Sequence, residues 1–187
     1  STGELIFCPV LVCVLPFSKY TFALTLVDAT IPQVIKGLNN CLQYLGGVPL
    51  SLKTDNMKQV VTKSCRYEPV FTEALQQWAL HYNITLLATR VAKPKDKSAV
   101  ENEVKIAYQR IYAPLRDEVF SSFNQLQAAI QKQLALHNEK QFQLKDHSRQ
   151  QQFMQLERSL LQPLPADMFV VKHQAIAKVQ KNYHITL

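Results

Sequence analysis

The sequence TRVAKPKDKSAVENEVKIAYQRIY, from Thr89 to Tyr112, joins a basic loop to an amphipathic helix. From residue 100 onward apolar side chains recur at helical spacing, and the first turn carries Glu101 and Glu103. A carboxylate placed against a phosphate backbone is repelled unless a divalent cation lies between them. The stretch therefore indicates a metal-dependent site that acts on nucleic acid. The basic residues of its loop are Arg90, Lys93, Lys95 and Lys97.

The same stretch has a purely structural interpretation. Ser98 and Glu101 have the spacing of a capping box, in which Glu101 would only satisfy a backbone N–H at the start of the helix. The lysines of the loop would then be solvated side chains with no ligand. This stretch alone leaves both interpretations open.

A second carboxylate follows a predicted strand at residues 50–54, which ends at Asp55. In α/β sheets the carboxyl ends of strands are common positions for functional side chains. Asp55 is equally suited to begin a turn or to cap a helical turn, and the local pattern alone favours that role.

The order of the predicted elements describes a mixed α/β sheet with helices on its faces. Strands are expected over 5–15, 20–27, 50–54 and 83–88, and helices over 30–45, 68–82 and 100–112. The first two strands form a hairpin that is apolar on both faces. We expect a core domain over 1–115, a helical extension and linker over 116–165, and the beginning of a small β-module over 166–187.

The charge balance favours a polyanionic partner. Lys and Arg exceed Asp and Glu by seven, and the sequence pI is about 9.3. The six residues expected to contact a DNA backbone are Arg90, Lys93, Lys95, Lys97, Lys58 and Lys63. The four cysteines have no zinc-site spacing, which predicts free thiols in a reducing compartment. The apolar run from Leu5 to Leu15 is too short to span a bilayer, so we expect a cytoplasmic protein without membrane contact.

Several runs of sequence resemble a known family. LKTDN at 52–56 and TRVAKPKDKSAVENEV at 89–104 are similar to the second and third acidic motifs of DDE transposases and retroviral integrases. More closely, the chain resembles the IstA-type transposases of bacterial insertion sequences. The runs that carry this resemblance are YLGGVP at 44–49, KTDNMKQVVTK at 53–63, RYEPVF at 66–71, YQRIYAPLRDE at 108–118 and LLQPLPADMF at 160–169.

The resemblance implies a ribonuclease H-like fold in which Asp55 and Glu101 are catalytic and hold Mg²⁺ or Mn²⁺. It implies 3′-end processing and strand transfer of DNA by two-metal phosphoryl transfer. The implied partners are transposon ends, target DNA, further copies of the chain and an AAA+ ATPase helper. A non-catalytic DNA-binding or assembly module, and a nuclease of the same fold, are the alternative functions.

One part of the family pattern has no counterpart in this sequence. The family's first catalytic Asp lies on a central strand that precedes the hairpin, whereas no Asp precedes Leu5 here. Asp28 follows the second predicted strand and leads into a helix, which is the wrong place. We therefore expect an internal fragment that lacks the central strand and is inactive alone.

Overall fold

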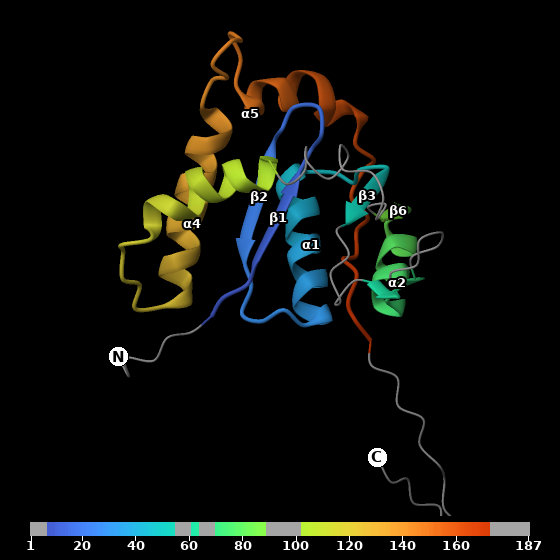
Figure 1. Cartoon of the computed structure of the whole chain (residues 1–187). Helices are drawn as coiled ribbons and strands as arrows, with labels where there is room; N and C mark the ends of the chain where they lie inside the picture. Colours follow the sequence, from blue (N-terminus) through green and yellow to red (C-terminus); the bar gives the residue numbers. More distant parts are fainter. Residues whose placement is uncertain (1–6, 55–60, 64–69, 89–101, 173–187) are drawn as a thin grey trace, which may run out of the picture.

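The computed structural model describes residues 7–54, 61–63, 70–88 and 102–172 of the chain. Its strands in these ranges form three two-stranded sheets, and helices pack on the two longer ones (Figure 1). No helix in the described ranges is long and apolar enough to cross a membrane.

A β-hairpin lies at the centre of the fold. Strands β1 (Val10–Val14) and β2 (Thr21–Thr25) pair antiparallel, with Val12 opposite Ala23 and Leu11 opposite Leu24. Alternate residues of a strand point to opposite faces, so these two pairs give each face of the hairpin apolar side chains. The predicted hairpin is confirmed, with shorter strands than the apolar runs suggested.

Helix α1 (Ile31–Leu45) covers one face of the hairpin. It lies so close that a Cβ at Gly37 would be 2.7 Å from a methyl carbon of Leu11. The helix ends as predicted at Gly46, whose φ of 69° is left-handed. Thr30 precedes the helix, but its hydroxyl donates to Asp28 and makes no capping bond.

A second group of helices covers the opposite face. Residues 102–107 are α-helical and continue through a π-helical turn η1 (Tyr108–Tyr112) and a 3₁₀ turn η2 (Ala113–Leu115). Helix α4 (Phe123–Glu139) packs beside them. The buried side chains that surround Ala23 on this face are Ala107, Ile111, Leu115, Ile130 and Leu134.

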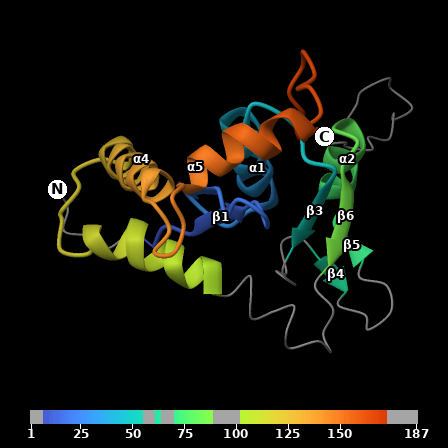
Figure 2. The ribbon, with the colours of Figure 1, turned by 90° about the horizontal axis from the view of Figure 1, so that it is seen from above.

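A parallel strand pair stands beside the hairpin. Strand β3 (Ser51–Thr54) pairs with β6 (Thr85–Ala88), and α2 (Glu73–His81) precedes β6. Trp78 on α2 is 1% exposed and belongs to the core, as its helical position predicted. Within the described residues β1 and β3 do not pair with each other, so the hairpin and the parallel pair are separate sheets (Figure 2).

The helix predicted over 68–82 begins later, at Glu73. Val70 and Phe71 instead form β5, which pairs with β4 (Val61–Lys63), a strand that is not among the predicted elements. Val and Phe favour extended backbone, and the extended Thr72 then begins the helix. The helical spacing seen in the sequence therefore overestimated the helix at its start.

A last helical segment comprises α5 (Arg149–Gln152), η3 (Phe153–Glu157) and η4 (Arg158–Leu160). Ser148 begins it with a capping box: its hydroxyl accepts from the Gln151 amide at 3.2 Å, and the Gln151 side chain accepts from the Ser148 amide at 2.9 Å. This reciprocal pair fixes the point at which the chain turns into the helix.

Residues 161–172 run back across α1 and α2 (Figure 1). Gln162 pairs with Val48 through two backbone hydrogen bonds, Asn39 donates to the Phe169 carbonyl at 2.8 Å, and the Phe169 amide donates to the Tyr82 hydroxyl at 2.9 Å. Residues 169–171, in the region expected to begin a β-module, do not form a strand, and the backbone of Phe169 bonds instead to side chains of the helical segments. The rest of the expected β-module lies outside the described residues, and the division of the chain into three regions stays a prediction.

Cys8, Cys13 and Cys41 are free thiols, as expected, and Cys41 is buried. The hydrogen bond with Cys13, followed by burial, raises the pKa of the Cys41 thiol. Cys65 lies outside the described residues.

The helical layer over Ala23 should contribute strongly to stability. Ile130→Ala removes a side chain that is fully buried between α4 and the hairpin, and we expect it to lower the free energy of unfolding by about 2–5 kcal/mol. Leu136→Ala on the same helix, where the side chain is 53% exposed, is the matched control and should change it by less than about 1 kcal/mol. Urea unfolding followed by circular dichroism measures both, and equal losses would contradict this account of the core.

Candidate nucleic-acid site at the ends of β3 and β6

The predicted site residues lie mostly in parts of the chain that the structure does not describe. Asp55, Glu101, Arg90 and the lysines at 58, 93, 95 and 97 are outside the described residues. Lys63 is the last residue of β4, but its side chain is outside the described part as well. The structure therefore positions the elements that flank these residues and leaves their side chains as predictions.

The flanking elements approach one another. Thr54, the residue before Asp55, is paired in register with Ala88, the residue before the basic loop. Because β3 and β6 are parallel, the chain leaves both strands at the same edge. The described part of the next helix, from residue 102 onward, lies with its first residues on the same side of the molecule (Figure 2). The described residues next to positions 55 and 101 in sequence therefore lie on one side of the molecule, and the placement of the two carboxylates stays a prediction.

One face of the parallel pair is open in the described part of the chain. Leu52 and Leu86 pack against the core formed with α1 and α2. Lys53 is exposed on the alternate face, and Leu87 is 46% exposed. A positive charge therefore stands two residues before Asp55 on a surface that a polyanion can reach.

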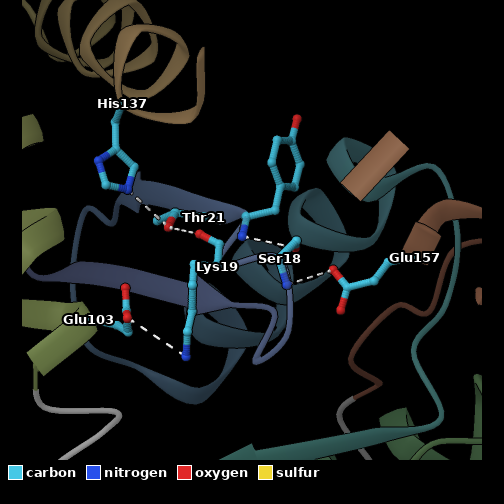
Figure 3. Close-up of polar contacts among 7 residues, drawn as sticks. Ser18, Lys19, Thr21, Glu103, His137 and Glu157 are labelled. Atoms are coloured by element: carbon cyan, nitrogen blue, oxygen red, sulfur yellow. Dashed lines mark hydrogen bonds and ion pairs between the residues drawn. The ribbon is translucent and has the colours of Figure 1, made fainter. Parts of the chain in front are cut away.

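The turn between β1 and β2 is held by side chains from three helical segments (Figure 3). Lys19 Nζ lies 3.7 Å from Glu103 Oε1, on the helix that starts at residue 102. The Ser18 amide donates to Glu157 Oε2 at 3.3 Å, on η3. The Thr21 amide donates to Asn138 Oδ1 at 3.0 Å, on α4. Nothing local in the sequence indicates this convergence.

The hydrogen bonds around Thr21 define the tautomer of His137. The Thr21 hydroxyl donates to the Lys19 carbonyl at 3.0 Å, so its oxygen accepts from His137 Nε2–H at 3.2 Å. His137 Nδ1 has no hydrogen-bond partner within the described structure. Burial, with the positive charges of Arg149 and Arg110, lowers the pKa of His137 to about 3. The imidazole is therefore neutral at physiological pH and acts as a structural donor.

Arg149 places a buried positive charge beside this turn. It is 3% exposed, and its guanidinium carbon lies 4.6 Å from the centre of the Phe142 ring. Burial and the charge of Arg110 lower the pKa of Arg149, whereas the carboxylate of Glu103 raises it. Glu103 thus faces positive charge from both the hairpin and α5.

Comparisons with known proteins give the class of the molecule. Residues 2–94 match the family model of the integrase core domain. The fold resembles the catalytic core of bovine immunodeficiency virus integrase, with a TM-score of 0.62 at 17% identity over 82% of this chain and 90% of that one. It also resembles a chain of a simian T-cell lymphotropic virus intasome, with a TM-score of 0.63 at 19% identity over 89% of this chain and 54% of that one. The predicted ribonuclease H-like fold is confirmed.

Among curated proteins, the chain is similar to transposases of bacteria. The chain is 36% identical to a protein of Sinorhizobium fredii named as transposase y4bL/y4kJ/y4tB, over 99% of this chain and 36% of the relative. It is 34% identical to a Burkholderia multivorans protein named as a transposase for insertion sequence IS408, over 94% of this chain and 34% of the relative. These matches support an integrase-like core of the kind found in insertion-sequence transposases, and the chain spans about a third of the length of these relatives.

The buried neutral histidine should make stability depend on pH. The folded pKa of His137, about 3, lies below the ordinary value of 6.5, so the unfolded chain binds the extra proton between these values. Its contribution is complete above pH 6.5 and is lost as the pH falls toward 3, by up to about 1.4 kcal/mol per pH unit. We expect His137→Gln, whose amide keeps a donor toward Thr21, to flatten this slope between pH 6.5 and 4.5. Urea unfolding at several pH values tests it, and an identical slope in the variant would contradict the assignment.

Proposed function

We propose that this chain forms the catalytic core of an insertion-sequence transposase, which cuts and joins DNA by phosphoryl transfer. The observation that carries the proposal is the register of β3 with β6, which places Thr54 beside Ala88. The segments that follow them in sequence contain Asp55 and the basic loop. The integrase core match over residues 2–94 supports the same reaction class.

Two carboxylates suit a hard divalent cation such as Mg²⁺, or Mn²⁺ in its place, because these ions prefer oxygen ligands. Asp55 and Glu101 would hold it, since the ends of β3 and β6 and the start of the helix at 102 face the same side (Figure 2). Within the described ranges no three His, Cys, Asp or Glu residues are grouped as a metal site, so the proposal depends on these two. The bound cation would offset the repulsion between carboxylate and phosphate and favour an oxygen nucleophile.

In the proposed reaction a water oxygen first attacks the scissile phosphate, and the free 3′-hydroxyl of the DNA then attacks a target phosphate. Each step forms one P–O bond and breaks another, with no covalent bond to the enzyme. Arg90, Lys93, Lys95 and Lys97, with Lys58 and Lys63, would hold the backbones in line through charge. Lys53, exposed on β3, adds a positive charge on the same sheet.

We further propose that the core needs another strand between β1 and β3. In the described part of the chain β1 pairs only with β2, and β3 pairs only with β6. Both strands nevertheless contribute to one apolar core, through Leu11 and Leu52. A strand inserted between these edges would join the two sheets and would bring the third carboxylate that the family pattern requires. On this proposal the 187-residue chain alone is inactive.

The assembly proposed from the resemblance comprises several copies of the chain, transposon ends, target DNA and an AAA+ ATPase helper. A net charge of +7 is consistent with the DNA component of that assembly. The same charge also supports a second candidate, a non-catalytic DNA-binding or assembly module. That candidate predicts DNA binding that is sensitive to salt and indifferent to divalent metal. The cytoplasmic location stays a prediction.

Catalysis is tested on a chimera that joins the N-terminal part of the Sinorhizobium fredii relative to this chain. We expect Asp55→Asn and Glu101→Gln each to lower Mg²⁺-dependent strand transfer of a labelled DNA end by at least about a hundredfold, because each removes a metal ligand. Asp117→Asn, at a carboxylate whose side chain is 89% exposed, is the matched control and should keep full activity. Unchanged activity in either of the first two variants would reject the assignment, and joined rather than only hydrolysed ends would distinguish a transposase from a nuclease.

DNA binding by the basic loop is tested with the double variant Lys93→Glu/Lys95→Glu. Each lost phosphate contact should reduce the slope of log K against log salt by about 0.9, so we expect a slope that is lower by about 1.8. Lys132→Glu on α4, combined with Lys140→Glu just after its end, makes the same change of charge at exposed positions and should leave the slope nearly intact. Fluorescence anisotropy of a labelled duplex over a range of NaCl concentrations measures both, and equal slopes would make the loop lysines bystanders.

A further inference from the structure

Lys19 has a backbone conformation that a lysine rarely adopts. Its φ is 60°, in the left-handed region that favours glycine and asparagine. The turn imposes this value, since the Lys19 amide donates to the Leu15 carbonyl at 3.0 Å and the Leu15 amide to the Tyr20 carbonyl at 3.0 Å. Glycine would fit the same turn without strain. A lysine at this position therefore suggests a use for its side chain.

The Lys19 ammonium is directed at Glu103 (Figure 3). Nζ and Oε1 are 3.7 Å apart, and only 15% of the Glu103 side chain is exposed, against 32% for Lys19. Partial burial weakens solvent screening of the pair and makes the loss of one partner costly. This contact is thus stronger than the exposed pair of Arg116 and Asp117, whose side chains are 77% and 89% exposed.

Glu103 also interacts electrostatically with a second positive charge, that of Arg149 on α5. It raises the pKa of the buried Arg149, whereas Arg110 lowers it. Removing the carboxylate would leave the Lys19 ammonium without its ion-pair partner and the repulsion between Arg149 and Arg110 without its counter-charge. That repulsion would act between α5 and the helical segment that carries Arg110.

The turn is a fixed anchor for this contact. Ser18 is fully buried, and its hydroxyl accepts from the Tyr20 amide at 3.1 Å. Asn138 both accepts from the Thr21 amide at 3.0 Å and donates to the Thr21 carbonyl at 2.7 Å. Because this turn is held rigidly, the Lys19 side chain has a fixed starting point, and its contact with Glu103 restricts the position of the helix that carries Glu103.

We propose that Glu103 is a positioning residue: through Lys19 and Arg149 it sets the place and rotation of the helix start on which the function of Glu101 depends. Glu103 lies two residues after Glu101 in sequence, so a contact that fixes the described helix at residue 103 limits where the preceding backbone can lie. This inference rests on the proposed function of Glu101. Its test has two arms, and the first of them, hydrogen exchange, does not depend on that function.

The first arm measures amide hydrogen exchange in the 187-residue chain at Ile106, Ala107 and Tyr108. Glu103→Gln and Lys19→Met should raise exchange there about tenfold, because either change frees the helix start. Lys19→Arg, which keeps the charge, should retain protection, as should Asp117→Asn, which breaks the exposed pair. Unchanged exchange in both Glu103→Gln and Lys19→Met would overturn the proposal.

The second arm measures strand transfer by the chimera as a function of Mg²⁺ concentration. We expect Glu103→Gln and Lys19→Met to raise the half-saturating Mg²⁺ concentration severalfold when measured well below the melting temperature of each variant, with Lys19→Arg close to the parent. A purely structural role would lower the folded fraction and leave the Mg²⁺ dependence as it is, which would overturn the positioning role. An inactive parent chimera would reject the proposed function, and the exchange arm alone would then decide whether Glu103 fixes the helix start.

Discussion

The hairpin of β1 and β2 is apolar on both faces, and the rest of the fold follows from the need to cover each of them. Leu11 and Leu24 require one layer and Val12 and Ala23 another, because exposing either face to water would forfeit the burial that stabilises the chain. Helix α1 supplies the first layer and the helices after residue 102 supply the second. The position of the second layer is important for function, since it begins next to Glu101 in sequence.

Local patterns predicted the elements that depend on local physics. The apolar strands of the hairpin, the end of α1 at Gly46 and the buried Trp78 of α2 all follow from composition, periodicity and backbone preference. The secondary-structure predictions failed where contacts with distant segments determine the local conformation. Residues 169–171 have the composition of a strand, but Phe169 bonds to Asn39 and Tyr82, which are 130 and 87 residues away in sequence. The pairing of β4 with β5 was missed because strands of three and two residues leave almost no pattern.

In the candidate site, too, the features that depend on local sequence were predicted and those that depend on distant segments were not. Motif spacing identified the family, and the register of β3 with β6 agrees with a common location for the segments that follow them. The polar contacts that hold the hairpin turn could not be predicted, because Glu157 and Asn138 lie 139 and 117 residues from their partners. Glu103 looked like an ordinary surface acid of a first helical turn. Its proposed positioning role follows only from the folded structure, in which Lys19 of the hairpin turn and the buried Arg149 of α5 both interact with it.

The return of residues 161–172 across α1 and α2 has a consequence for biosynthesis. Asn39 accepts hydrogen bonds from Trp78 and Tyr82 and donates to Phe169, so three segments meet at one side chain. A ribosome adds roughly 5–20 residues per second, so the 130 residues between Asn39 and Phe169 take roughly 6–26 s to synthesise. During that interval the surface of α1 and α2 is uncovered, and a chaperone has time to occupy it before the nascent chain closes over itself.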